Sequence, residues 1–596
     1  MLTSNSGVTA AQLVLRDIGI IAVVAAASVW LAWIGYQGWG LDDWHYLLAA
    51  ERWANAPPHV GETHWELRLG FVLPLAASLG WLGYSEAALV AVPVVFYAAL
   101  VLVNYGFVAS LIGRIQGLFA GIVTATVPVI AAWATTPRVA IAEALYLSVA
   151  FWCFATVGLT RQRGHAWLLI SGVCVGLAWL SRESAIGFAL AFLLLFFIGR
   201  PVRRKKYIWL LTGAALVVVA ELGFYWSTTG NPFYRLYIDL HHGVITSSAG
   251  QAPDAKAVVA RARGEAGVAA RDASYAGQQD MAVRGPAAAD ADLGSAENAA
   301  TAAPGAPVEL RLWGKLERLG QALAQHFDPK KLSGEGTVAP VSVSRLAEPY
   351  VLFLIEPYYG LVVWLLVPAA AYLLAVRAPP RTKLLVILLL AFAACSIVAS
   401  LYLIYLRPLP RYFLFVAGAA GVIVGLALGT LWLRRRRRIA VAILVAFAIS
   451  SAVFMEARRG LGLYNERRLV DFAASTEKPI YTDDATIRMS ELFVRSGRFR
   501  GALSGCPTPA SILFFNSMRS ADEEALAAVA VGAILGSTEL VYVHQGNEKI
   551  LGRILRTVGL SRMLPDYTVE RLAYPYGVAG AFDLGWLELC ELVEPK

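Results

Sequence analysis

The chain has 596 residues, of which 58% are hydrophobic and only 16% are charged. A typical soluble domain is about 25% charged, so this composition and a mean hydropathy of +0.58 exclude a soluble protein and predict a multi-pass membrane protein. The formal net charge of +9 does not indicate nucleic-acid binding, because the basic residues cluster in short segments between apolar runs.

Eleven apolar runs reach or approach the roughly 20 residues that cross a bilayer. We predict spans at 17–36, 87–112, 115–135, 138–160, 166–181, 184–199, 207–226, 350–376, 384–406, 410–433 and 438–455. If the N-terminus is cytoplasmic, every basic cluster falls inside, as the positive-inside rule requires. These clusters lie at 161–163, 200–206, 377–383 and 434–438. The odd number of spans then places the C-terminal segment outside the cytoplasm.

Two long outer segments interrupt the spans. Residues 37–86 are too polar to cross the membrane and are rich in tryptophan, which predicts short interfacial helices on the outer surface. Residues 229–349 form a second outer loop. Within it, 247–309 is a low-complexity insertion that we expect to be poorly ordered, and 310–349 could form an amphipathic helix.

The tail changes character after residue 456. Strand-like runs at 479–482, 511–516, 539–544 and 567–574 alternate with helical patterns at 522–535 and 547–559. This alternation predicts a small soluble α/β domain. We therefore divide the chain into a transmembrane domain, 1–456, and an extracytoplasmic domain, 457–596.

Acids and arginines gather on the outer turns of the predicted topology. The candidates are Asp42, Asp43, Tyr46, His64, Glu66, Arg68, Arg138, Glu143, Arg182, Glu183, Arg411 and Tyr412. A carboxylate can act as the general base that deprotonates an acceptor hydroxyl or amine. Arginine offers a planar pair of donors to a phosphate. Together they predict group transfer from a lipid-linked phosphate at the membrane surface.

Each candidate also has a structural interpretation. Asp42 could cap the helix that follows it, Arg68 could extend to lipid headgroups, and His64 could pack within its loop. The histidines do not follow a known zinc spacing. We therefore expect no metal or other cofactor, although the sequence leaves open whether a divalent cation is required.

Five short motifs lie on the outer face in a fixed order. They are Asp-Asp-x-x-Tyr at 42–46, Arg-x-x-x-x-Glu at 138–143, Leu-Ser-Arg-Glu-Ser at 180–184, Gly-Asn-Pro at 230–232 and Pro-Arg-Tyr at 410–412. In this respect the chain resembles the glycosyltransferase C (GT-C) superfamily, and within it the protein O-mannosyltransferases and the bacterial aminoarabinose transferases.

The resemblance implies an inverting transferase in the plasma membrane, which in bacteria is the inner membrane. Its donor would be a polyprenyl-phosphate sugar, and its acceptor a lipid, a glycan or a protein. Asp42 matches the acid that activates the acceptor, Asp43 its acidic neighbour and Glu143 a further catalytic acid. The resemblance assigns the donor phosphate to Arg182 and to Arg411 with Tyr412.

Arg68 is a further candidate for the donor phosphate, on its position alone. The other polar residues of the outer turns, Tyr46, His64, Glu66, Arg138 and Glu183, are candidates for other substrate contacts. The alternative function is a transporter or flippase of a lipid-linked or anionic substrate. Such a protein should carry ionisable residues in mid-span.

Overall fold

The computed structural model describes residues 9–35, 41–160, 164–239, 361–399 and 413–457, and after these mainly five strands of the C-terminal segment. The side chains of residues 33–44 are not among those described. The low-complexity insertion, the predicted helix within 310–349, and Arg411 with Tyr412 lie outside the described residues.

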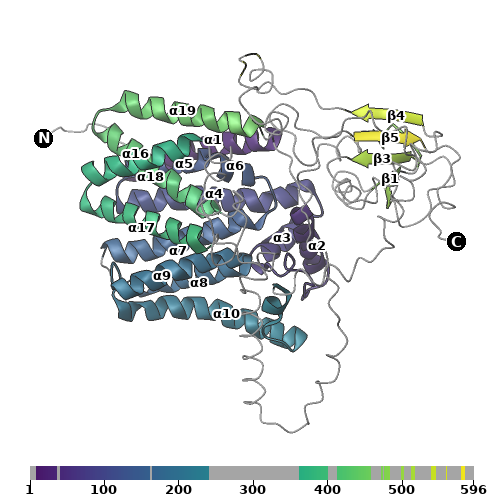
Figure 1. The fold of residues 1–596 in the computed structure, drawn as a ribbon, viewed down its shortest axis with the longest axis horizontal. Coiled ribbons are helices and arrows are strands. Elements are labelled where there is room, and N and C mark those ends of the chain that lie inside the picture. Colours follow the sequence, from purple (N-terminus) through teal and green to yellow (C-terminus); the bar gives the residue numbers. More distant parts are fainter. Residues whose placement is uncertain are drawn as a thin grey trace, which may run out of the picture.

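Every predicted span has a helical counterpart, which confirms the polytopic helical fold (Figure 1). The helices are α1 (Ala10–Gly35), α2 (Leu41–Asn55), α3 (Leu69–Leu82), α4 (Glu86–Leu111), α5 (Arg114–Thr126), α6 (Pro128–Trp133), α7 (Val139–Thr160), α8 (His165–Ser181), α9 (Ile186–Ile198), α10 (Tyr207–Thr229), α16 (Leu361–Arg377), α17 (Pro380–Val398), α18 (Leu414–Leu433) and α19 (Arg437–Ala457). In the described part of the chain, six helices are long and apolar enough to span a membrane by length and composition alone. The other apolar helices are shorter.

The predicted span at 115–135 is divided in two. α5 ends at Thr126, Val127 is extended, and α6 begins at Pro128. Proline has no backbone N–H and disfavours a helical conformation in the residue before it. The continuous hydrophobicity of this run therefore does not produce a continuous helix.

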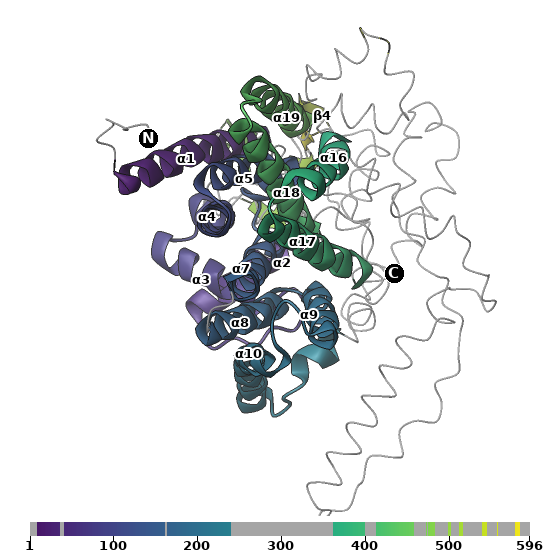
Figure 2. The same ribbon diagram turned by 90° about the vertical axis from the view of Figure 1, so that its left-hand side faces the viewer.

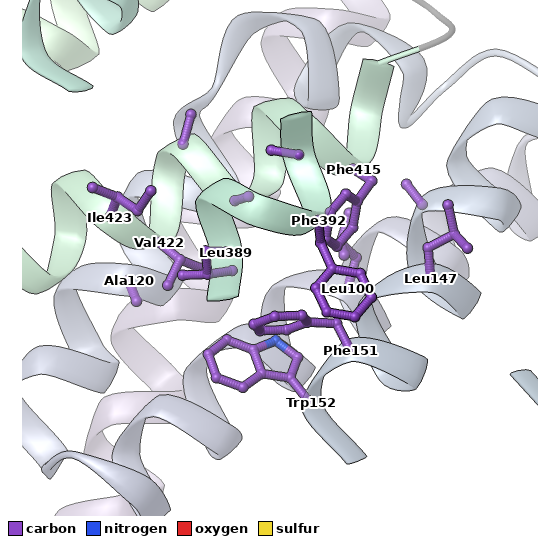
Figure 3. Close-up of a cluster of buried hydrophobic side chains, with 14 of the residues drawn as sticks. Leu100, Ala120, Leu147, Phe151, Trp152, Leu389, Phe392, Phe415, Val422 and Ile423 are labelled. Carbon is purple, nitrogen blue, oxygen red and sulfur yellow. The ribbon is translucent and has the colours of Figure 1, made fainter. Parts of the chain in front are cut away.

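The centre of the bundle is formed by α7 and α18, each of which has 89% of its spanning window buried. Figure 2 shows α8 and α10 on one side of this centre and α1, α5 and α19 on the other. Aromatic rings join the two halves of the chain (Figure 3). Phe392 of α17 lies 5.4 Å from Phe151 of α7 and 4.8 Å from Phe188 of α9, measured between ring centroids.

The first outer segment forms α2 and α3, as predicted, and α3 is also part of the bundle. Phe71, Val72 and Leu75 of α3 are fully buried, and the helix contacts α4, α7 and α8. Tyr46 of α2 packs edge-on against Phe71 at 5.6 Å. This segment is therefore packed against the helices of the bundle.

Helices α8 and α10 approach each other closely at two glycines. A Cβ added at Gly172 would lie 1.9 Å from the carbonyl oxygen of Leu210, and one added at Gly213 would lie 2.1 Å from that of Leu169. Both obstacles are backbone atoms, which cannot rotate away. This close contact fixes the end of α10 relative to the end of α8.

The C-terminal segment contains a five-stranded sheet in the order β2-β1-β3-β5-β4. The strands are β1 (Ile480–Thr482), β2 (Phe499–Gly501), β3 (Ile512–Asn516), β4 (Glu539–His544) and β5 (Ala579–Asp583). β1 pairs in parallel with β2 and β3, whereas β5 runs antiparallel to β3 and β4. Three of the predicted strands are confirmed. The predicted strand at 567–574 and nearly all of both predicted helices lie outside the described residues.

Candidate active site

Four segments bring charged residues to the same end of the bundle. Arg68 precedes α3, Glu143 lies in the second turn of α7, Arg182 to Ser184 link α8 to α9, and Arg235 follows α10. Because neighbouring helices alternate in direction, the start of α7 and the ends of α8 and α10 lie on one face. Residues distant in sequence thus meet in one polar network.

Glu143 and Arg182 form a buried ion pair with 3.8 Å between a carboxylate oxygen and a guanidinium nitrogen. Each side chain is only 6% exposed. The Ser184 hydroxyl donates a hydrogen bond to the other carboxylate oxygen of Glu143. Glu143 and Ser184 also line a narrow cavity of about 10 Å³, together with Phe413, which precedes α18, and Phe415 of α18.

Arg68 is held between α2 and the α8–α9 turn. Its guanidinium donates a hydrogen bond to the Tyr46 hydroxyl and lies 3.7 Å from a carboxylate oxygen of Glu183. The Arg68 side chain is 10% exposed, and its buried Nε has no hydrogen-bond partner among the described residues. A buried guanidinium with an unsatisfied donor has capacity for another acceptor.

Arg235 completes the network from the segment after α10. It lies 3.0 Å from Glu183, 3.1 Å from Glu221 and 3.5 Å from Asp239, measured between nitrogen and oxygen. Burial opposes ionisation of Glu183, but Arg68 and Arg235 hold its pKa below the usual range. Burial, followed by the negative charge of Glu183, raises the pKa of Asp239 to about 7.

The other predicted residues of the first outer loop are brought to the same face but outside this network. Glu66 is paired with Arg52 and His59, both at 3.2 Å. The ring of His64 lies 3.7 Å from that of Trp65. The contact of His64 fits its structural interpretation, and neither set of contacts tests a role in substrate binding.

The remaining candidates are placed only in part. Arg138 lies over the Trp133 ring at 4.8 Å. Asp42 and Asp43 occupy the first turn of α2, but their side chains are not described, and Arg411 and Tyr412 precede the described Phe413. Their predicted roles stay predictions.

The sequence-based site did not include Arg235, Glu221 or Asp239. Glu221 could have been found from the sequence, because it is the lone acid in the apolar run 207–226. An ionisable residue within a span usually has a partner. Asp239 and Arg235 are separated by four residues in a polar segment, and nothing local distinguishes them from solvated loop residues.

Metal binding is not indicated by the described part of the chain. No group of three or more His, Cys, Asp or Glu side chains there is arranged to hold an ion. The carboxylates of the network instead face arginines.

Residues 69–226, from α3 to α10, match the family described as dolichyl-phosphate-mannose-protein mannosyltransferase. The match covers the segments that supply Glu143, Arg182 and Glu183. The match covers only this part of the chain and agrees with the resemblance drawn from the motifs. The apolar helices make the protein a multi-pass membrane protein. A search of curated proteins finds no match.

Several solved structures are similar to this chain, including the following two. One is the oligosaccharyltransferase AglB from Archaeoglobus fulgidus in complex with an inhibitory peptide and a dolichol-phosphate, at 14% identity and a TM-score of 0.45, covering 80% of this chain and 63% of that one. The other is ArnT from Cupriavidus metallidurans bound to undecaprenyl phosphate, at 13% identity and a TM-score of 0.45, covering 99% and 100%. This chain thus spans less than two thirds of the archaeal protein.

Proposed function

We propose that this protein transfers a sugar from a polyprenyl-phosphate donor to an acceptor at the extracytoplasmic face of the plasma membrane, with inversion at the anomeric carbon. The observation that carries this proposal is the convergence of Arg68, Glu143 and Arg182 in one buried network at the outer helix ends. A lipid-linked phosphate would lie at the same depth, with its tail among the spans.

The arginines suit a phosphate leaving group. Arg68 retains an unsatisfied Nε donor although most of its side chain is buried, and guanidinium groups bind phosphate through two parallel hydrogen bonds. When the bond between the sugar and the phosphate breaks, negative charge grows on the phosphate. Fixed cations in a water-poor site stabilise that charge.

Asp42 is the proposed general base. Positions 42 and 46 lie one helical turn apart in α2 and therefore share a helix face, and Tyr46 is bonded to Arg68. This arrangement supports a role for Asp42 beside the phosphate site. The acceptor oxygen or nitrogen attacks the anomeric carbon from the side opposite the phosphate, its proton passes to Asp42, and the lipid phosphate leaves with the bonding electron pair.

The orientation is inferred from charge. The exposed basic run Arg434 to Arg438 lies between α18 and α19, at the end of the bundle opposite to Arg182. Basic residues concentrate on the cytoplasmic side of membrane proteins. The network at the other end then faces the outside, where we propose that the acceptor is a lipid, a glycan or a protein.

We propose that catalysis needs no metal or other cofactor. Glu143 and Glu183 are each neutralised by arginine, so neither has a free charge to attract a cation. Activity that survives dialysis against a chelator would agree with this proposal, and loss restored by one divalent ion would contradict it.

The transporter alternative is less well supported. In the described spans, Glu143 lies in the second turn of α7, and Asp17 is paired with Arg114 near the opposite end of the bundle. Glu221 lies about two turns before the end of α10 and is paired with Arg235. A transport pathway normally places ionisable residues at mid-depth.

The test is an assay of the purified protein in detergent with a panel of polyprenyl-phosphate sugars and candidate acceptors. Products are identified by mass. Asp42→Asn should abolish transfer without changing expression or unfolding temperature. Normal turnover by this variant would remove Asp42 from the mechanism, and the absence of transfer by the wild type with every donor would reject the proposed function.

A further inference from the structure

We propose that Arg235 is a positioning residue that holds Arg68 and Arg182 in the geometry needed to bind the donor phosphate. The proposal rests on the function inferred above and assigns a role to a residue outside the recognised motifs. Arg235 lies after α10, at the start of the second outer loop, and its side chain is only 5% exposed.

Arg235 reaches Arg68 through Glu183. One carboxylate oxygen of Glu183 accepts a hydrogen bond from Nη2 of Arg235 at 3.0 Å, and the other lies 3.7 Å from Arg68. The carboxylate therefore bridges the two guanidinium groups. The position of the Glu183 carboxylate therefore determines the orientation of the Arg68 guanidinium.

Arg235 reaches Arg182 through the end of α8. The same Nη2 donates to the carbonyl oxygen of Trp179 at 2.8 Å, and the guanidinium carbon lies 5.3 Å from the Trp179 ring centroid. Carbonyls in the last turn of a helix lack intrahelical partners, and arginine is a favourable group there. Since Trp179 precedes Arg182 by one helical turn, this bond fixes the point from which Arg182 leaves the helix.

The charge balance explains why this position needs arginine. Three carboxylates, on Glu183, Glu221 and Asp239, surround Arg235. Its planar fork binds Glu221 through Nη1 while Nη2 serves both Glu183 and Trp179. A lysine ammonium is a single point charge and cannot hold these partners in the same directions.

The same contacts show that Arg235 does not itself bind phosphate. Both of its terminal nitrogens are used by protein acceptors, and its Nε faces Asp239. The Nε atoms of both Arg68 and Arg235 lack a hydrogen-bond partner among the described residues, but that of Arg235 lies 3.5 Å from the carboxylate of Asp239. Arg235 therefore acts through Arg68 and Arg182.

The test compares Arg235→Lys with Arg114→Lys in the full-length protein. Arg114 is a control, because it also pairs with a buried carboxylate but at the opposite end of the bundle. Two of its nitrogens lie 2.5 Å from the oxygens of Asp17. We expect Arg235→Lys to raise the KM for the donor at least tenfold while the KM for the acceptor stays within twofold. Arg114→Lys should lower the unfolding temperature and leave both KM values unchanged.

Binding of undecaprenyl phosphate alone provides a second readout that does not require sugar transfer. Arg235→Lys should weaken it at least tenfold, and Glu183→Gln should weaken it as well if Arg235→Lys cannot be purified. Wild-type affinity in the Arg235 variant overturns the proposal, and so does an equal loss in Arg114→Lys.

The two readouts separate the positioning role from the proposed function. A wild-type protein that binds the lipid phosphate but transfers no sugar would reject the enzymatic function while leaving the positioning role supported by the binding data. A wild-type protein that does not bind the lipid phosphate would overturn both.

Discussion

Replacing Glu143 by glutamine tests the central ion pair of the proposed site. The substitution keeps the size of the side chain and an oxygen for the Ser184 hydroxyl, but removes the negative charge that lies 3.8 Å from Arg182. Two unit charges about 4 Å apart interact by about 4 kcal/mol at an effective dielectric constant of about 20. Removing one partner of a buried pair usually costs about 3–5 kcal/mol.

The expected effect on activity follows from the position of Arg182. Without Glu143, its guanidinium is no longer held toward the donor. If only a third of the interaction energy is lost from transition-state binding, kcat/KM for the donor falls by about tenfold. The assay is the initial rate of transfer against donor concentration, expressed per folded molecule.

Asp17→Asn serves as the control for stability. Asp17 is fully buried and paired with Arg114 at the opposite end of the bundle. This variant should also unfold at a lower temperature but keep the wild-type rate per folded molecule. If Glu143→Gln lowers the unfolding temperature and leaves the donor dependence unchanged, the ion pair is structural and our interpretation of Arg182 is wrong.

Three further predictions concern other parts of the molecule. Arg411→Ala should raise the KM for the donor, and an unchanged KM would assign Arg411 a structural role. Burial and the charge of Glu183 raise the pKa of Asp239 to about 7, so the folded protein keeps this proton at higher pH than the unfolded chain. The resulting stability is fully present below about pH 4 and lost as the pH rises through about 7. Unfolding temperatures measured from pH 5 to pH 8 should therefore fall more steeply for the wild type than for Asp239→Asn, and parallel curves would contradict this. Finally, Gly213→Ala should destabilise the protein by about 1–3 kcal/mol, because its Cβ would meet the backbone of α8. Gly223→Ala on the same helix meets nothing within 4 Å and should have little effect.

The arrangement of the spans could be predicted from the sequence because its signals are local. Apolar length identifies a span within a single run, and the arginine and lysine clusters give its direction without knowledge of the neighbouring helices. The interruption of the helix within the predicted span 115–135 also has a local cause. Pro128 interrupts the helix although hydrophobicity continues across it.

The strands of the C-terminal sheet could be predicted from the sequence only in part. β3 and β4 have alternating or continuous apolar residues of their own and were predicted. β5, with the sequence Ala-Gly-Ala-Phe-Asp, contains little intrinsic strand preference. It forms because it pairs on both sides, with β3 and with β4, and such partners are not visible in a single segment.

The candidate site was only partly accessible to sequence reasoning. Glu143 and Arg182 were selected as outer-turn residues, but nothing in either segment indicates that they meet. Arg235 was not assigned to the site because its role depends on Glu183, Glu221 and the carbonyl of Trp179, which come from different segments. The sequence by itself thus determined which segments form apolar helices and which polar residues lie near their ends. Only the packing of the helix ends decided which acid neutralises which arginine, because a buried charge is stabilised by its neighbours in space.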